Sequence, residues 1–302
     1  METRDWSLVV FTLLSQAAVG AFLTLLVLRR LAARRGAVAS GGALFVPLLA
    51  VLIVLSAGLF AALFHLSTPL QAARAVVNFS SSWLSREIVF GSLFAALLAA
   101  LVALERPAAG SPRARPWLGG VAALAGLTFL YSQTAIYLLP AQPAWNSFAT
   151  PAAFGGTALL LGILGVAAAQ AAGGLPPALD PAPRHGGGSW TTVRGLALAG
   201  LIVLAAELVV PPLHLAALAA DGSAAAAASA QRLTGDYGGV FLLRLALLGV
   251  AAAALAGVAG SRLRSVRRQP TAALTYVAFA AAVLAELCGR FLFYAMQVRV
   301  GI

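Results

Sequence analysis

His65 and Glu87 are the two residues of this sequence whose types and positions most favour chemistry. Each stands near the end of a long apolar segment, and 21 residues separate them. A histidine changes its charge near neutral pH, and a carboxylate accepts protons, so the pair could act as a proton acceptor and relay. A histidine that caps a helix or lies at a membrane interface would explain His65 equally well. Residue types and spacing leave both interpretations open.

The link between these two residues predicts a short helix of its own. Ser67 or Thr68 can cap a helix, Pro69 suits its first turn, and helix-forming residues follow. We expect this helix to lie at a membrane surface and to present Arg74 outward. Trp83, near the end of the link, fits the aromatic belt that membrane proteins place at that surface.

The composition of the chain requires a bilayer as the solvent of its apolar segments. Of the 302 residues, 61% are hydrophobic and only 10% are charged, whereas about a quarter are charged in soluble domains. At about 20 apolar residues per helical span, there is room for eight spans and short loops. We therefore predict an all-α integral membrane protein that forms a single domain over residues 1–302. Its eight predicted spans are about 6–28, 42–64, 86–104, 117–139, 151–172, 195–215, 238–260 and 273–296.

The distribution of arginine orients these spans. The net charge of +11 involves no lysine, and 13 of the 20 arginines lie in the loops after the first, third, fifth and seventh predicted spans. Cytoplasmic loops carry such an excess, so these loops are predicted to be cytoplasmic and both termini to lie outside. The opposite loops are rich in Trp, Asn, Tyr and Pro, which indicates a shaped outer surface and a large partner there.

Five further ionisable residues fall inside the predicted spans, where each costs about 2.5–3.5 kcal/mol to insert and is a functional candidate by default. Glu286 and Arg290 stand four residues apart on one helix face, so we expect them to neutralise each other. Glu207 needs a partner from another helix, and Arg244 either pairs with it or extends to the membrane surface. His214 follows two prolines that we expect to kink its helix. We interpret this set as structural; a transport path lined by Glu207, Glu286 and Arg290 is the alternative.

The histidine and cysteine positions argue against a metal centre within this protein. A membrane cytochrome b needs two facing axial histidines per haem, deep in the bundle. Only His65 and His214 lie in or near predicted spans, both toward the outer end, so two haems are excluded and one is disfavoured. Cys288 is the single cysteine, and the sequence has no metal-binding cluster, phosphate-binding loop or nucleophile motif. We therefore predict no haem and no metal.

Several stretches, in order from one end of the sequence to the other, carry a family resemblance. They include HLSTPLQAARAVVNFSSSWLSREI from His65, PAWNSFATP from Pro143, GDYGGVFLLR from Gly235 and AELCGRFLFYAMQV from Ala285. The protein resembles the membrane-anchor subunit of dimethyl sulfoxide reductase and, more distantly, the polysulfide reductase membrane subunit. The resemblance implies eight spans in a bacterial or archaeal cytoplasmic membrane, with both termini in the periplasm.

The resemblance also implies a function. Anchors of this family bind a quinol, typically menaquinol, contain no haem, and pass two electrons to a periplasmic iron–sulfur subunit that feeds a molybdopterin catalytic subunit. On this basis His65 and Glu87 hydrogen-bond the quinol hydroxyls and accept their protons, and the anchor itself catalyses no bond change. The other residues of the implied quinol site are Leu66, Ser67, Pro69, Arg74, Trp83 and Arg86. Ser67 stands where the family often has glycine, and Arg74 could replace a basic residue that the family often has near Gln71.

Two alternatives remain open from the sequence. One is a purely structural membrane anchor without a quinone site, which would tolerate the loss of His65 and Glu87. The other is a small-solute transporter.

Overall fold

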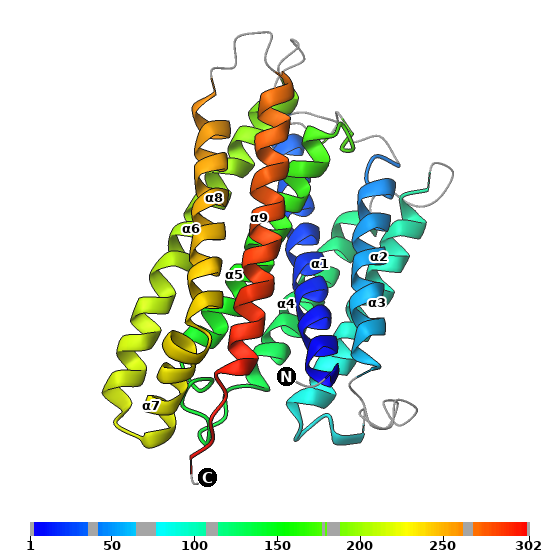
Figure 1. Ribbon diagram of the computed structural model, residues 1–302. Helices are drawn as coiled ribbons and strands as arrows, with labels where there is room; N and C mark the ends of the chain where they lie inside the picture. Colours follow the sequence, from blue (N-terminus) through cyan, green and yellow to red (C-terminus); the bar gives the residue numbers. More distant parts are fainter. Residues whose placement is uncertain are drawn as a thin grey trace.

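The computed structural model describes residues 3–35, 42–64, 77–106, 114–176, 179, 188–261 and 268–300, and this part of the protein is helical without any strand. The helices form a bundle in which most of them run along one another (Figure 1). The prediction of an all-α fold is confirmed for these residues. In sequence order the helices are α1 (Thr3–Arg34), α2 (Phe45–Ala62), α3 (Trp83–Leu104), α4 (Ala114–Ala135), α5 (Ala149–Ala171), α6 (Gly188–Asp221), α7 (Ala224–Gln231), the π-helix η3 (Arg232–Asp236), α8 (Gly238–Gly260) and α9 (Arg268–Ala295).

Seven helices of the described ranges are long and apolar enough to cross a membrane, namely α1, α2, α3, α5, α6, α8 and α9. The fourth predicted span, 117–139, coincides with α4, which has 22 residues but is not among the seven. α4 begins with a buried Arg115 and ends in a polar run of Ser132, Gln133 and Thr134. These groups make α4 less apolar than the seven helices. The count of eight spans, which includes α4, therefore stays a prediction.

Helix α6 is longer than the sequence predicted. The expected span 195–215 ended soon after Pro211 and Pro212, but the helix continues through both prolines to Asp221. Proline is tolerated inside membrane helices because neighbouring groups satisfy the backbone carbonyls that it leaves unpaired. The helix stops where Gly222 adopts a φ of 75°, a conformation that favours glycine.

Two short helices between α6 and α8, α7 and η3, were not predicted. Ser223 starts α7 because its side-chain oxygen accepts a hydrogen bond from the Ala226 amide at 3.2 Å. With eight residues, α7 is too short to carry the apolar signal of a span. The surface helix that the sequence predicts after Ser67 lies almost entirely outside the described residues.

Two clusters of buried side chains divide the bundle into halves. One lies mainly among α1, α2, α3 and α4 and includes Phe22, Phe94 and Phe129. The other lies among α1, α5, α6, α8 and α9 and includes Leu164 and Leu255. Figure 1 shows the blue and cyan helices on one side and the yellow and red helices on the other. Helices α1 and α5 pack along each other and join the halves.

The contact between α1 and α5 is a contact between backbones. A Cβ atom added to Gly20 would lie 1.7 Å from the Ala158 carbonyl oxygen, and one added to Gly162 would lie 2.1 Å from the Gly20 carbonyl carbon. No side chain larger than hydrogen fits at either glycine. Small residues that allow such an approach are typical of helix interfaces in membranes, where dispersion contacts drive association.

The end of the bundle where α1 begins and α9 ends, here called the terminal face, is an ordered surface (lower end of Figure 1). The Val300 amide donates to the Ala141 carbonyl at 2.9 Å, and Arg232 Nη1 donates to the Gln297 carbonyl at 2.6 Å. These bonds tie the segment after α9 both to the loop before α5 and to η3. The aromatic and polar loops that the sequence analysis assigned to one side of the membrane meet at this face.

Candidate functional site

The structure describes part of the predicted site. Three of its residues lie in the first turns of α3, namely Trp83, Arg86 and Glu87. The remainder lie outside the described residues: His65, Leu66, Ser67, Pro69 and Arg74. The side of α3 that enters the bundle can therefore be built from the structure, and the contribution of the preceding link stays a prediction.

Arg86 holds the backbone in place where it enters α3. Its Nε donates to the Phe79 carbonyl at 3.0 Å and its Nη2 donates to the Ser80 carbonyl at 2.7 Å. The guanidinium also lies over the Trp83 ring, 4.1 Å from its centroid. Cation–π contacts of this kind add stability beyond the hydrogen bonds. The arginine therefore fixes the loop beside Glu87.

Glu87 points into the bundle and is 7% exposed. Its side chain is hydrogen-bonded to that of Gln133 in α4. Gln133 is itself held by α1, because its Nε2 donates to Ser15 Oγ at 2.8 Å and its Oε1 accepts from Gln16 Nε2 at 3.4 Å. Three helices thus fix the position of one buried carboxyl group.

Two tyrosine hydroxyls lie near this carboxyl group. Those of Tyr137 and Tyr294 are hydrogen-bonded at 2.9 Å, and Tyr294 is also hydrogen-bonded to the Thr12 side chain. Both hydroxyls are close enough to Glu87 and Arg290 to interact with their charges. The sequence analysis did not identify this pair.

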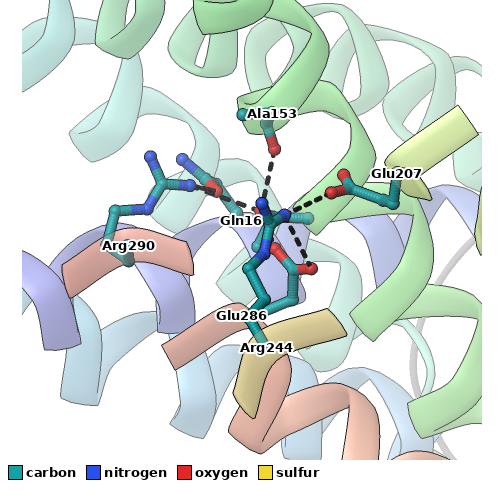
Figure 2. Close-up of polar contacts among 7 residues, drawn as sticks. Gln16, Ala153, Glu207, Arg244, Glu286 and Arg290 are labelled. Atoms are coloured by element: carbon teal, nitrogen blue, oxygen red, sulfur yellow. Dashed lines mark hydrogen bonds and ion pairs between the residues drawn. The ribbon is translucent and has the colours of Figure 1, made fainter. Parts of the chain in front are cut away.

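A second group of charges lies buried between α5, α6, α8 and α9 (Figure 2). Arg244 Nη2 lies 2.5 Å from Glu207 Oε2 and 3.7 Å from Glu286 Oε1. The second oxygen of Glu286 accepts a hydrogen bond from Thr157 Oγ1 at 2.5 Å. The expectation that Glu207 takes its partner from another helix is confirmed, and of the two positions expected for Arg244 the structure shows the paired one.

The mutual neutralisation expected for Glu286 and Arg290 does not take the form of a direct ion pair between them. Arg290 Nη2 donates to Gln16 Oε1 at 2.6 Å and to Thr157 Oγ1 at 3.4 Å, and the guanidinium lies 3.9 Å from the Phe154 ring centroid. The four-residue spacing does place both residues on the buried side of α9. However, the Thr157 hydroxyl from α5 bridges the two charged groups, and a spacing rule within one helix cannot foresee a group from another.

Two glycines make room for these charges. A Cβ atom on Gly156 would lie 1.9 Å from Glu207 Oε1, and one on Gly289 would lie 2.7 Å from Arg244 Nε. The backbone itself therefore forms part of the wall around the ion pairs. Protein interiors are close-packed, so the room that these two glycines leave for the charged side chains is a specific feature of the fold.

The contacts join into one buried polar network that reaches from α3 to α6. Its charged members were recognisable in the sequence, whereas Gln16, Gln133 and Thr157 were not, because uncharged polar residues inside apolar runs are a weaker signal than charges. The positions of Gln16 and Gln133 inside otherwise apolar spans were the one sequence feature that could have indicated the network. The network runs through Glu87, Gln133, Gln16, Arg290, Thr157, Glu286, Arg244 and Glu207.

A separate ion-pair group lies at the opposite end of the bundle. The buried Glu105 lies 3.2 Å from Arg29 Nη1 and 3.7 Å from Arg115 Nε, and it accepts a hydrogen bond from the Gly42 amide. The sequence analysis treated these arginines only as loop charges that orient the protein. In the structure they also connect α1, α3 and α4.

Metal-binding geometry is not found in the part of the protein that the structure describes: no three His, Cys, Asp or Glu side chains are grouped to hold an ion. His214 is buried near the terminal face and hydrogen-bonded to the backbone of Ala144.

Comparison with known proteins gives a match over nearly the whole sequence. Residues 1–296 match the family described as DMSO reductase anchor subunit (DmsC). The sequence is 28% identical over 304 residues to one of the chains of the anaerobic dimethyl sulfoxide reductase of Escherichia coli (strain K12), and the match covers 99% of this protein and 96% of that relative. It is 29% identical over 308 residues to the anaerobic dimethyl sulfoxide reductase chain YnfH of the same organism, with coverage of 99% and 96%. A third relative, from the anaerobic dimethyl sulfoxide reductase of Haemophilus influenzae, is 30% identical over 163 residues, with coverage of 52% and 55%.

Proposed function

Because the protein belongs to the DMSO reductase anchor subunit family and is a multi-pass membrane protein, we propose that it anchors an anaerobic reductase and oxidises a quinol of the menaquinol class. The observation that carries the proposal is the environment of Glu87. This buried carboxyl group is hydrogen-bonded to Gln133 and interacts electrostatically with the hydroxyls of Tyr137 and Tyr294. A hydroquinone presents two hydroxyl donors, for which a positioned carboxylate is a suited proton acceptor.

Each residue then has a defined part in the oxidation. A quinol that becomes a quinone releases two electrons and two protons. In the proposed reaction one hydroxyl proton passes to Glu87 and the other to His65, and both protons leave toward the terminal face. Gln133, fixed by Ser15 and Gln16, holds the carboxylate in one position while the proton arrives. Such positioning removes the need for the acceptor to reorganise during the step.

The electrons leave through a partner. The E. coli relatives are named as single chains of anaerobic dimethyl sulfoxide reductases, so we propose that this protein also assembles with other subunits. An iron–sulfur subunit would dock on the terminal face, and a molybdopterin subunit would receive the electrons from it. The bonds that tie residues 296–300 to the loop before α5 and to η3 support this site, because a preformed surface loses less conformational entropy on binding.

We also propose that α4 is the eighth span and that the terminal face is periplasmic. With 22 residues α4 is about 33 Å long, which suffices for a hydrocarbon core of about 30 Å. Helix α1 begins and α9 ends at the same face (Figure 1), as an even number of crossings requires. The arginine-rich loops at the opposite end support a cytoplasmic assignment there.

Reporter fusions test this orientation. Alkaline phosphatase, which is active only outside the cytoplasm, is expected to be active when fused after Ile302 and inactive when fused after Gly110. A fluorescent protein that folds only in the cytoplasm should give the opposite pattern at the same two positions. Activity of the phosphatase after Gly110 together with inactivity after Ile302 would mean that the orientation is reversed.

Replacement of His65 with alanine tests the quinol site. Quinol-driven turnover of the assembled complex is expected to fall by at least about 100-fold, the usual contribution of a positioned proton acceptor. A reduced viologen dye that supplies the catalytic subunit directly should still support turnover in the same membranes. His185→Ala, in a predicted cytoplasmic loop, is the matched control and should keep both activities. Equal loss of both activities in His65→Ala would indicate that His65 has a structural role and is not a proton acceptor.

The absence of haem is also testable. Reduction of the purified complex with dithionite is expected to produce no b-type absorption band. The reason is the scarcity of histidine, since His65 and His214 are the only histidines in or near the predicted spans. A b-type band that co-purifies with this protein in stoichiometric amount would overturn the proposed direct transfer from quinol to the partner.

A further inference from the structure

A small polar cavity lies beside the buried ion pairs. It has a volume of about 70 Å³ and is lined by α5, α6, α8 and α9, with Leu233 of η3 at one side. Apolar side chains such as Leu292, Phe293 and Met296 form part of its wall. The polar part of the wall consists of Thr150, Thr157, His214, Arg244, Glu286 and Arg290.

The polar residues of this wall carry atoms that the described protein groups leave without a hydrogen bond. His214, Glu286 and Arg290 are 6%, 2% and 3% exposed, so bulk solvent hardly reaches their side chains. A buried polar atom without a partner costs about 1–3 kcal/mol, and more if it is charged. Within the described residues, the atoms concerned are His214 Nε2, Arg244 Nε, Glu286 Oε1, Arg290 Nε and Arg290 Nη1. Their grouping around one cavity indicates a polar occupant.

We infer that this cavity is a binding site for a small cluster of water molecules inside the membrane-embedded bundle. Its volume suffices for several water molecules, each of which needs roughly 10–15 Å³ on the same measure. It is about half the ~150 Å³ that an engineered cavity offers to benzene, so the ring system of a quinone does not fit. The site is therefore distinct from the proposed quinol site near Glu87.

The balance of charge and of donors selects water over an ion. Arg244 and Arg290 of the wall are matched by Glu286 of the wall and by Glu207 behind Arg244, so this group as a whole has no net formal charge for an added ion to neutralise. The wall offers donors in the arginine nitrogens and an acceptor in Glu286 Oε1. A water molecule donates and accepts at once and can serve both. These waters would hydrate the charged groups and lower the cost of keeping them in the bilayer.

Hydroxyl-radical footprinting of the purified complex tests this site, because radicals formed from bound water oxidise the side chains next to it. Leu292 lines the cavity and is 4% exposed, whereas Leu98 lies in the apolar core of the other half and is fully buried. Leu292 is expected to be oxidised severalfold faster than Leu98. Equal, slow oxidation of Leu292 and Leu98 would show that the cavity is dry and would overturn the inference.

A cavity-filling variant separates bound water from solvent that enters from the terminal face. Ala153 lines the cavity, and Ala153→Leu is expected to suppress oxidation of Leu292. The matched control is Ala206→Leu, at an exposed position on α6, which should leave the oxidation unchanged. Unchanged oxidation in Ala153→Leu would contradict a water site.

Replacement of chloride by gluconate in the buffer should have no effect on the oxidation of Leu292. A chloride-dependent oxidation pattern would identify an anion site instead. If Ala153→Leu does not assemble, the comparison of Leu292 with Leu98 in the unsubstituted protein still shows whether the cavity holds water.

Discussion

Replacement of Glu87 with glutamine is expected to lower quinol-driven turnover of the assembled complex by about 100-fold to 10,000-fold, the range for loss of a general base. The amide has nearly the shape of the carboxylate and can keep a hydrogen bond to Gln133, but it does not accept a proton from a quinol hydroxyl. Turnover driven by a reduced viologen dye should stay within about twofold of the unsubstituted complex, because the dye bypasses the proton acceptor. The quantity to measure is the ratio of the two activities in one membrane preparation.

Glu105→Gln provides the matched control for this variant. Glu105 is also a buried glutamate, but it directly follows the other end of α3 and pairs with Arg29 and Arg115. Its replacement should reduce the amount of assembled complex without changing the ratio of quinol-driven to dye-driven turnover. A changed ratio in Glu105→Gln, or an unchanged one in Glu87→Gln, would argue that Glu87 has only a structural role.

Arg244→Met is expected to be the most destabilising single change in the buried network. It leaves Glu207 and Glu286 without their shared cation, and an unpaired buried charge costs about 3–5 kcal/mol. At roughly 2–4 °C per kcal/mol, the unfolding temperature in detergent should fall by about 10 °C. The measurement is the fraction of monodisperse protein that remains after heating over a range of temperatures.

Two further variants make that result specific. Arg30→Met makes the same chemical change at an exposed position of α1 and should shift stability by less than about 0.5 kcal/mol. Arg244→Lys keeps the charge, and its unfolding temperature should lie between those of Arg244→Met and Arg30→Met. If Arg244→Met unfolds at the same temperature as Arg30→Met, then Arg244 is not the shared partner of Glu207 and Glu286.

The positions of the helices could be predicted because a bilayer sets the length of an apolar run. Each predicted span coincides with one of the long helices, including α4, although its crossing is not established. The ends were harder to predict, as α6 shows. Its predicted span ended at residue 215, shortly after the two prolines that were expected to kink it, but the helix continues to Asp221, because a membrane helix can continue through proline when its neighbours satisfy the freed carbonyl groups.

The candidate site was predictable only in its charged members. Glu87, Glu207 and Arg244 stand out in the sequence because charge in a span is rare and costly. Their partners depend on how each helix is rotated about its axis, which local spacing does not determine. Arg290 and Gln16 illustrate this, since they are hydrogen-bonded across 274 positions of the sequence.

The glycine contact between α1 and α5 also sets the register of the polar network. Gly20 lies one helical turn from Gln16, so the seating of Gly20 against Gly162 fixes the height of Gln16 in the membrane. A slide of α1 by one turn, about 5.4 Å, would carry Gln16 out of reach of both Gln133 and Arg290. The position of Gln16, and through Gln133 the position of the Glu87 carboxyl group at the proposed quinol site, is therefore set by a contact between two backbones and does not depend on side-chain packing there.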